Sequence, residues 1–202
     1  MCIRDRGNGS HTELLLTTWN RPLLLEKISC ALASQEINII GADVHTRKDG
    51  LVCDLFQVCT KDLESVTKKR TRERVLEVFK EINSYPDHHG DYNAAKYLKK
   101  KTNLLRKDNT EGGIPFPTSV YISNELSATC TAIEIQALDR IGLLHDLFFA
   151  IGEMGMATVH ARICTEKGAA MDTIYVTWPD GGKIEDEGKQ QEIQKTLEKL
   201  IG

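Results

Sequence analysis

The sequence predicts an α+β protein made of two copies of one module, each with the element order strand, helix, strand, strand, helix. The segment 17–25 (TTWNRPLLL) returns as 136–144 (QALDRIGLL), which is an offset of 119 residues. Residues 42–46 return at the same offset, and residues 50–58 return with one residue fewer in the intervening loop. A chain of 202 residues accommodates two domains of roughly 100 residues each. Two copies of one module therefore explain the sequence better than one large domain.

Hydrophobic spacing identifies the elements of the second copy. Apolar and polar residues alternate from 131 to 138, which predicts a half-buried strand. Apolar residues then recur at helical spacing from 143 to 151, and Gly155 ends that helix. The remaining elements are expected to be strands at 158–165 and 170–178 and a last helix with an apolar stripe of Ile193, Leu197, Leu200 and Ile201.

The first copy repeats this pattern. Its expected elements are a strand at 11–18, a helix at 23–34, strands at 38–46 and 51–60, and a helix at 71–84. Nearly all of the apolar stripes on these elements are interpreted as core.

An additional alternating strand at 118–123 precedes the second copy. At the repeat offset, the corresponding strand of the first copy falls at the chain start, where residues 1–6 (MCIRDR) do not alternate. We therefore expect residues 1–9 to be a non-native or disordered start, and the chain to be the tail of a longer one. The first domain, 10–86, is accordingly expected to lack its N-terminal strand.

A polar segment joins the two copies. It contains two adjacent histidines, three consecutive lysines and a Gly-Gly pair, which is the composition of a connection. Leucine and tyrosine residues near 97–98 and 104–105 allow a short helix within it. We assign residues 87–116 to this linker and residues 117–202 to the second domain.

The composition excludes several classes of protein. The hydrophobic fraction of 41% and the charged fraction of 27% are typical of soluble globular proteins. A net charge of −3 gives no general attraction to nucleic acid or to an anionic membrane. No apolar run approaches the roughly 20 residues that span a bilayer, and the N-terminus has no signal-peptide core. The six cysteines form no C-x-x-C pair, so we interpret them as reduced thiols of a cytoplasmic protein.

No catalytic constellation is evident in these residues. There is no Ser-His-Asp order, no nucleotide-binding glycine loop and no acidic pair of a nucleotidyltransferase. The six histidines do not have the spacing of metal ligands. We therefore expect this segment to contain no catalytic residues, no metal site and no cofactor.

The repeated motif resembles that of a known family. Asp139-Arg140-x-Gly142-Leu143-Leu144 lies between a predicted strand and a predicted helix, and 161–165 and 172–176 follow at matching positions. Together these segments resemble the ACT domain. Over roughly residues 10–202 the chain is similar to the paired ACT domains at the C-terminus of the bifunctional uridylyltransferase/uridylyl-removing enzymes, which modify the nitrogen-regulatory PII protein.

This resemblance implies a fold and a function. The implied fold is two ferredoxin-like sandwiches, each an antiparallel sheet with helices on one face, which pair side by side within or between chains. The implied function is sensing of a free amino acid, with glutamine favoured. The implied partners are catalytic nucleotidyltransferase and phosphohydrolase domains preceding this segment, and a PII-type protein acting through them.

The resemblance also places the ligand. It would lie between two ACT domains on the turn between the first strand and the first helix, where the helix amides attract its carboxylate. The residue before the helix would bind the ammonium group. Asn20 and Asp139 occupy that position, followed by Arg21 and Arg140.

Neither turn has the full ACT pattern. The first copy has Leu23 where the second has Gly142, and a side chain at Leu23 is expected to crowd the helix amides. We therefore expect the second turn to be functional and to share one pocket with Asn38 of the first copy. The candidate ligand-binding residues are Asp139, Arg140, Ile141, Gly142, Leu143, Asn20, Arg21 and Asn38.

Other interpretations of these residues remain open. Asn20 and Asp139 are good helix caps whether or not anything binds, and Asp54 and Asp172 are expected to make structural hydrogen bonds in the sheet. The chain is alternatively a stand-alone ACT-repeat protein or the regulatory tail of another amino-acid-metabolic enzyme. RNA binding, which the ferredoxin-like plan also serves, is disfavoured by the acidic mid-strand positions and the negative net charge.

Overall fold

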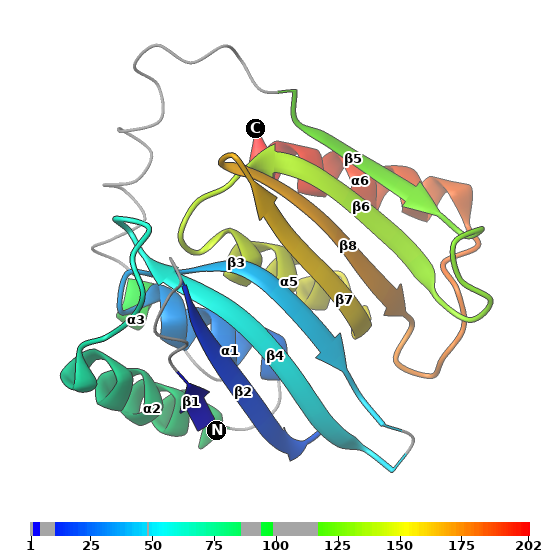
Figure 1. Cartoon of the computed structure of the whole chain (residues 1–202). Coiled ribbons are helices and arrows are strands. Elements are labelled where there is room, and N and C mark those ends of the chain that lie inside the picture. The colour runs from blue at the N-terminus through cyan, green and yellow to red at the C-terminus, as the bar shows by residue number, and fades with distance from the viewer. Residues whose placement is uncertain (1, 5–10, 48, 86–93, 99–116) are drawn as a thin grey trace.

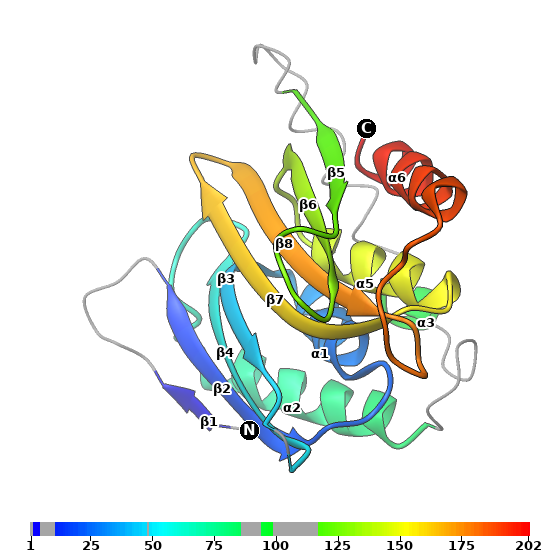
Figure 2. The same cartoon turned by 90° about the vertical axis from the view of Figure 1, so that its right-hand side faces the viewer.

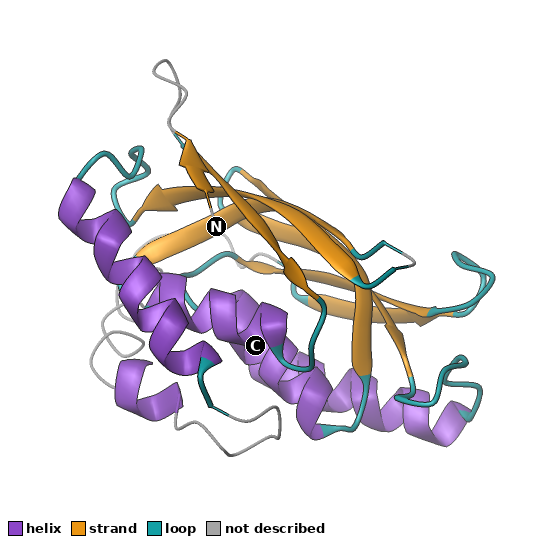
Figure 3. Cartoon of the chain, turned by 90° about the horizontal axis from the view of Figure 1, so that it is seen from below, coloured by secondary structure: helices purple, strands orange, loops and turns teal. Residues whose placement is uncertain are grey.

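The computed structural model describes residues 2–4, 11–47, 49–85, 94–98 and 117–202. Within these residues the chain forms one antiparallel eight-stranded sheet, and helices cover one of its faces (Figures 1 and 3). Of the expected linker, residues 94–98 form the short helix α3 (Ala94–Leu98). The linker histidines and residues 104–105 lie outside the described residues.

Each half of the chain has the predicted element order. The first half consists of β1 (Cys2–Arg4), β2 (Thr12–Trp19), α1 (Leu24–Ala33), β3 (Ile37–His45), β4 (Leu51–Thr60) and α2 (Lys69–Asn83). The second half consists of β5 (Ser119–Ser123), β6 (Thr131–Leu138), α5 (Leu143–Glu153), β7 (Ala157–Glu166), β8 (Ala169–Thr177) and α6 (Glu187–Ile201). The prediction of two ferredoxin-like sandwiches with helices on one face is confirmed.

The two halves join edge to edge through β3 and β7. The strand order is β1-β2-β4-β3-β7-β8-β6-β5, so the second half repeats the first in reverse across the sheet (Figures 1 and 2). At the centre of this pairing Asp43 lies opposite Arg162, and these two residues are equivalent at the repeat offset of 119. An approximate two-fold axis therefore passes between β3 and β7.

Local contacts repeat as closely as the element order. The Thr12 hydroxyl accepts a hydrogen bond from the Val66 amide at 2.8 Å, and its equivalent Thr131 accepts one from the Ile184 amide, also at 2.8 Å. Both threonines are buried, so these bonds satisfy polar groups inside the core. The sequence repeat is thus a repeat of tertiary contacts as well.

The helices form a second layer in the order α2-α1-α5-α6, because α1 contacts both α2 and α5, and α5 contacts α6 (Figure 3). The two central helices are buried against each other and against the sheet, and the outer pair is amphipathic. None of the helices among the described residues is both long and apolar enough to cross a membrane.

The predicted strand at 118–123 is confirmed, because β5 pairs with β6 along its whole length. The prediction that the first half lacks the equivalent strand is wrong. β1 pairs with β2, and Cys2 lies opposite Leu15. The equivalent residues of the second half, Tyr121 and Glu134, also lie opposite each other, so the two pairs of strands have the same register. Pairing of this kind needs only main-chain donors and acceptors at the edge of β2, so it does not require the alternation that the sequence lacks.

Candidate functional site

The two-fold relation creates two equivalent junctions between the halves. At the first junction, the turn before α1 (residues 20–23) faces the start of β7. At the second junction, the turn before α5 (residues 139–142) faces the start of β3. Each of the ten residues that line the second junction has its counterpart, 119 residues away, in the lining of the first. The two junctions are therefore alternative versions of one site.

The second junction is closed by its own side chains. The Asn38 amide donates a hydrogen bond to Asp139 Oδ2 at 2.7 Å, and the Thr165 hydroxyl donates to the same oxygen at 3.0 Å. The remaining void is about 10 Å³, which is at the lower limit of what one water molecule requires. Burial raises the pKa of Asp139, although the bonds from Asn38 and Thr165 oppose that shift. The structure thus brings Asp139, Gly142 and Asn38 together as predicted; that they bind a ligand stays a prediction.

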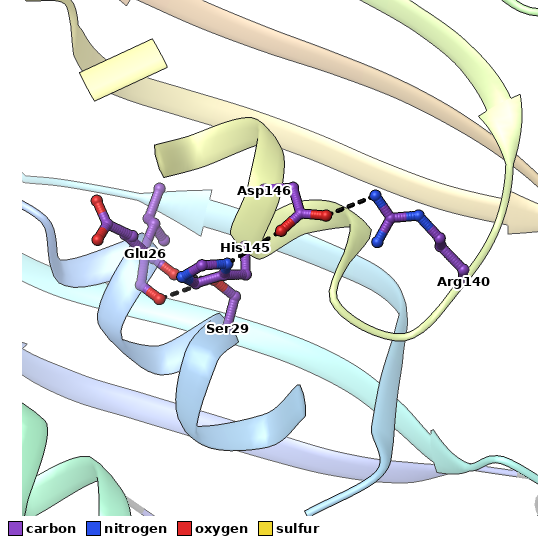
Figure 4. Close-up of polar contacts among 6 residues, drawn as sticks. Glu26, Ser29, Arg140, His145 and Asp146 are labelled. Atoms are coloured by element: carbon purple, nitrogen blue, oxygen red, sulfur yellow. Dashed lines mark hydrogen bonds and ion pairs between the residues drawn. The ribbon is translucent and has the colours of Figure 1, made fainter. Parts of the chain in front are cut away.

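Arg140 is held at the second junction by an acidic neighbour. Its guanidinium contacts Asp146 Oδ2 at 2.5 Å, and Asp146 Oδ1 lies 3.3 Å from Nδ1 of the buried His145 (Figure 4). Burial raises the pKa of Asp146, but the contacts with His145 and Arg140 outweigh it, so the pKa lies below its ordinary value. Figure 4 also shows His145 facing α1 beside Ser29, so this group of contacts lies at the interface of α1 with α5.

The first junction is open. It encloses a cavity of about 580 Å³, which falls in the range of small-molecule sites. Its polar lining includes Asn20, Asp54 and Thr158, and its apolar walls include Phe148, Ile151 and Met156. The equivalent of Asp146 in this half is Lys27, so Arg21 has no acid at that position and instead donates to the Asn83 carbonyl at 3.2 Å.

Both turns have the same backbone form. Leu23 and Gly142 occupy the residue before α1 and α5, with φ angles of 62° and 85°, in the left-handed region. Neither residue caps its helix with a side chain. The Leu143 amide donates to the Arg140 carbonyl at 3.1 Å, and the other first amides of each helix have no intrahelical acceptor. A carboxylate placed at either turn would meet those amides.

Two equivalent carboxylates lie in the sheet below the junctions. The buried Asp54 accepts a hydrogen bond from the His45 amide at 3.0 Å, and the buried Asp172 accepts one from the Cys164 amide at 3.2 Å. The prediction of structural hydrogen bonds for both is confirmed. Burial raises the pKa of Asp54 to about 6, and burial together with the Asp139 charge raises the pKa of Asp172 to about 7.

The remaining predicted site residues lie elsewhere. The side chains of Ile141 and Leu143 are buried in the core and line neither junction. Reasoning from the sequence missed Asp54 and Phe148 as parts of the first cavity. Nothing in the sequence distinguished Phe148 from the other apolar residues on the buried face of its helix. For Asp54 there was a signal, because an acidic residue within a run of buried strand residues is unusual.

The chain is similar in sequence to known proteins. Residues 119–201 match the family model of the ACR9-like, ACT-like domain. The chain is 28% identical over 190 residues to a bifunctional uridylyltransferase/uridylyl-removing enzyme of Rhodospirillum rubrum, in a match that covers 94% of this chain. That match spans 20% of the length of the enzyme. Residues 119–201 are thus similar to an ACT-like domain, and nearly the whole chain is similar to a fifth of the enzyme.

Among solved structures, the chain is similar to aspartate kinase from Synechocystis. The superposition covers 95% of this chain and 27% of the kinase chain, with a TM-score of 0.47 and 14% sequence identity.

Proposed function

We propose that this chain is an amino-acid-sensing regulatory module, with glutamine as the first ligand to test. We propose further that it serves a cytoplasmic uridylyltransferase/uridylyl-removing enzyme acting on a PII-type protein, in line with the relative from Rhodospirillum rubrum. The observation that carries the proposal is the cavity of about 580 Å³ at the first junction. It combines the volume of a small-molecule site with exposed helix amides and a few polar groups in an apolar wall.

The cavity offers a complementary group for each part of a free amino acid. The ligand carboxylate would accept hydrogen bonds from the first amides of α1, where the helix dipole favours negative charge. The ammonium group would lie toward the Asn20 side chain, with the Asp54 carboxylate in the same wall. The aliphatic part would contact Phe148, Ile151 and Met156 from the other half.

A ligand in this position would touch both halves at once. Its binding free energy would therefore favour the arrangement in which the turn before α1 and the start of β7 stand at the right separation. By linkage, that preference would bias any catalytic domain whose own state depends on the same arrangement.

Calorimetric titration of the chain with each of the common amino acids tests this proposal. We expect one class of binder, with glutamine the first candidate. Asn20→Ala should weaken binding by roughly 10- to 100-fold, since a hydrogen bond to a charged group contributes about 1.5–3 kcal/mol. Asp139→Ala, the equivalent change at the closed junction, is the matched control and should leave binding unchanged.

Two results would count against this assignment. If no amino acid binds the folded chain, the proposed function is wrong. If Asp139→Ala removes binding and Asn20→Ala does not, the ligand lies at the second turn, as the sequence pattern alone predicted.

A further inference from the structure

We infer that the residue near the start of each central strand decides which junction admits a ligand, so that the chain binds one molecule rather than two. This inference rests on the proposed function and specifies its stoichiometry. The deciding residues are Asn38 on β3 and Ala157 on β7, which are equivalent at the offset of 119.

The two residues have opposite effects on their junctions. The Asn38 side chain crosses from one half to the other and donates to Asp139 at 2.7 Å. Ala157 carries only a methyl group, so it makes no such bond to Asn20 across the first junction. The enclosed volumes differ accordingly, with about 10 Å³ behind Asn38 and about 580 Å³ beside Ala157.

The turns themselves do not explain this difference. Leu23 and Gly142 share the left-handed conformation, and the bulkier residue belongs to the open junction. The helix walls do not explain it either. Phe148 lines the open junction where the smaller Ser29 lines the closed one.

The chemistry of the closed junction makes Asn38 a built-in competitor. Its amide N–H occupies a place on the Asp139 carboxylate that a ligand ammonium group would take. An incoming amino acid would have to break this bond and leave the half-buried Asn38 amide without its partner, which is unfavourable. At the first junction an amino acid displaces no such side-chain bond.

The test is calorimetric titration of the full chain with glutamine, or with whichever amino acid proves to be the binder. The wild-type chain should bind one molecule. Ala157→Asn should weaken binding at least tenfold, because the new amide can reach Asn20 and close the first junction. Val159→Asn is the matched control: it places the same side chain on the same strand at an exposed position outside the cavity, and should bind like wild type.

The converse substitution should open the second junction. Asn38→Ala should raise the stoichiometry from one to two, and adding Asp139→Ala should return it to one. Thermal unfolding of each variant checks that it is folded; should Asn38→Ala not fold, Ala157→Asn decides alone.

The outcomes separate this inference from the function on which it rests. A wild-type chain that binds no amino acid overturns both. A wild-type chain that binds two molecules, an Ala157→Asn variant that binds like wild type, or a folded Asn38→Ala variant that still binds one overturns the inference and leaves the sensing function standing.

Discussion

Leu23 and Gly142 precede their helices with the same left-handed backbone, although only glycine adopts that conformation without steric cost. The sequence predicted a helix at 23–34, and within a helix a glycine at position 23 would lower stability. The structure reverses this expectation, because residue 23 is not in the helix interior but in the left-handed position before it. The turn geometry is imposed by the fold, and Leu23 carries the strain.

This strain predicts an inverted order of stability at position 23. Leu23→Gly and Leu23→Ala both remove the side chain, but only glycine relieves the left-handed strain. We expect Leu23→Gly to be more stable than Leu23→Ala by about 1 kcal/mol, whereas alanine is the more stable residue in a helix by a similar amount. Chemical denaturation of the two variants measures the difference. An alanine variant equal to or more stable than the glycine variant would show that the turn is not left-handed in solution.

The buried Asp172 carboxylate should make stability depend on pH. Its pKa of about 7 in the folded chain lies above the value of 3.8 for an exposed aspartate, so folding favours the protonated form. The contribution of Asp172 to the free energy of unfolding is present in full below about pH 4, and it is lost as the pH rises through 7. Asp54 has a pKa of about 6, so it changes stability with pH in the same direction, over a narrower pH range.

Asp172→Asn should remove this dependence, because the amide stays neutral and its oxygen can still accept from the Cys164 amide. We expect the unfolding free energy of the variant, relative to wild type, to increase from pH 5 to pH 8 by an amount on the order of 3 kcal/mol. Urea unfolding at several pH values measures it. Parallel pH profiles for the two proteins would mean that Asp172 is not buried as an acid.

For single helices and strands, the spacing of apolar residues in the sequence was sufficient to predict every element that buries one face. The half-buried strand β6 alternates and the outer helix α6 carries a stripe, so both were predictable within a few residues. β1 was not predictable, because three residues are too short for a period, and its pairing depends on the exposed edge of β2.

The junctions show the same limit for the candidate site. The repeat and the resemblance to ACT domains were sufficient to predict that Asn38 and Asp139 share a junction. The open cavity was not predictable, since it follows from what Ala157 fails to fill and from which apolar side chains of α5 face the junction. Sequence periodicity assigns such residues to a buried face but does not distinguish a packed face from a hollow one.

Removing residues 1–6 tests the role of β1. Without them, the outer edge of β2 presents unpaired main-chain groups. We expect the free energy of unfolding to fall by about 1 kcal/mol, the contribution of one or two backbone hydrogen bonds, and association to increase with protein concentration. Denaturation and light scattering on the shortened chain measure both. A shortened chain that matches the full one in both measurements would mean that β1 does not pair in solution.

At the scale of the whole molecule, the two halves form one body with a shared sheet and a shared helix layer. β3 pairs with β7, α1 packs against α5, and the His160 ring donates to the Val44 carbonyl across the same boundary. The approximate two-fold axis relates two equivalent junctions, of which one is open and the other is closed by its own side chains. We propose that only the open junction binds a ligand. A regulatory signal would then depend on one ligand stabilising one boundary.

A free amino acid is proposed to bind at the first junction, between the turn before α1 and the start of β7. The most direct measurement is an NMR titration of the nitrogen-15-labelled chain with glutamine, following the backbone amides. We predict that the largest shifts occur at the amides of Leu24 and Leu25, at the start of α1, and at Thr158 on β7, whose side chains line the cavity. Shifts centred instead on Leu143 and Leu144 of the second turn, or no shifts at saturating amino acid, would contradict it.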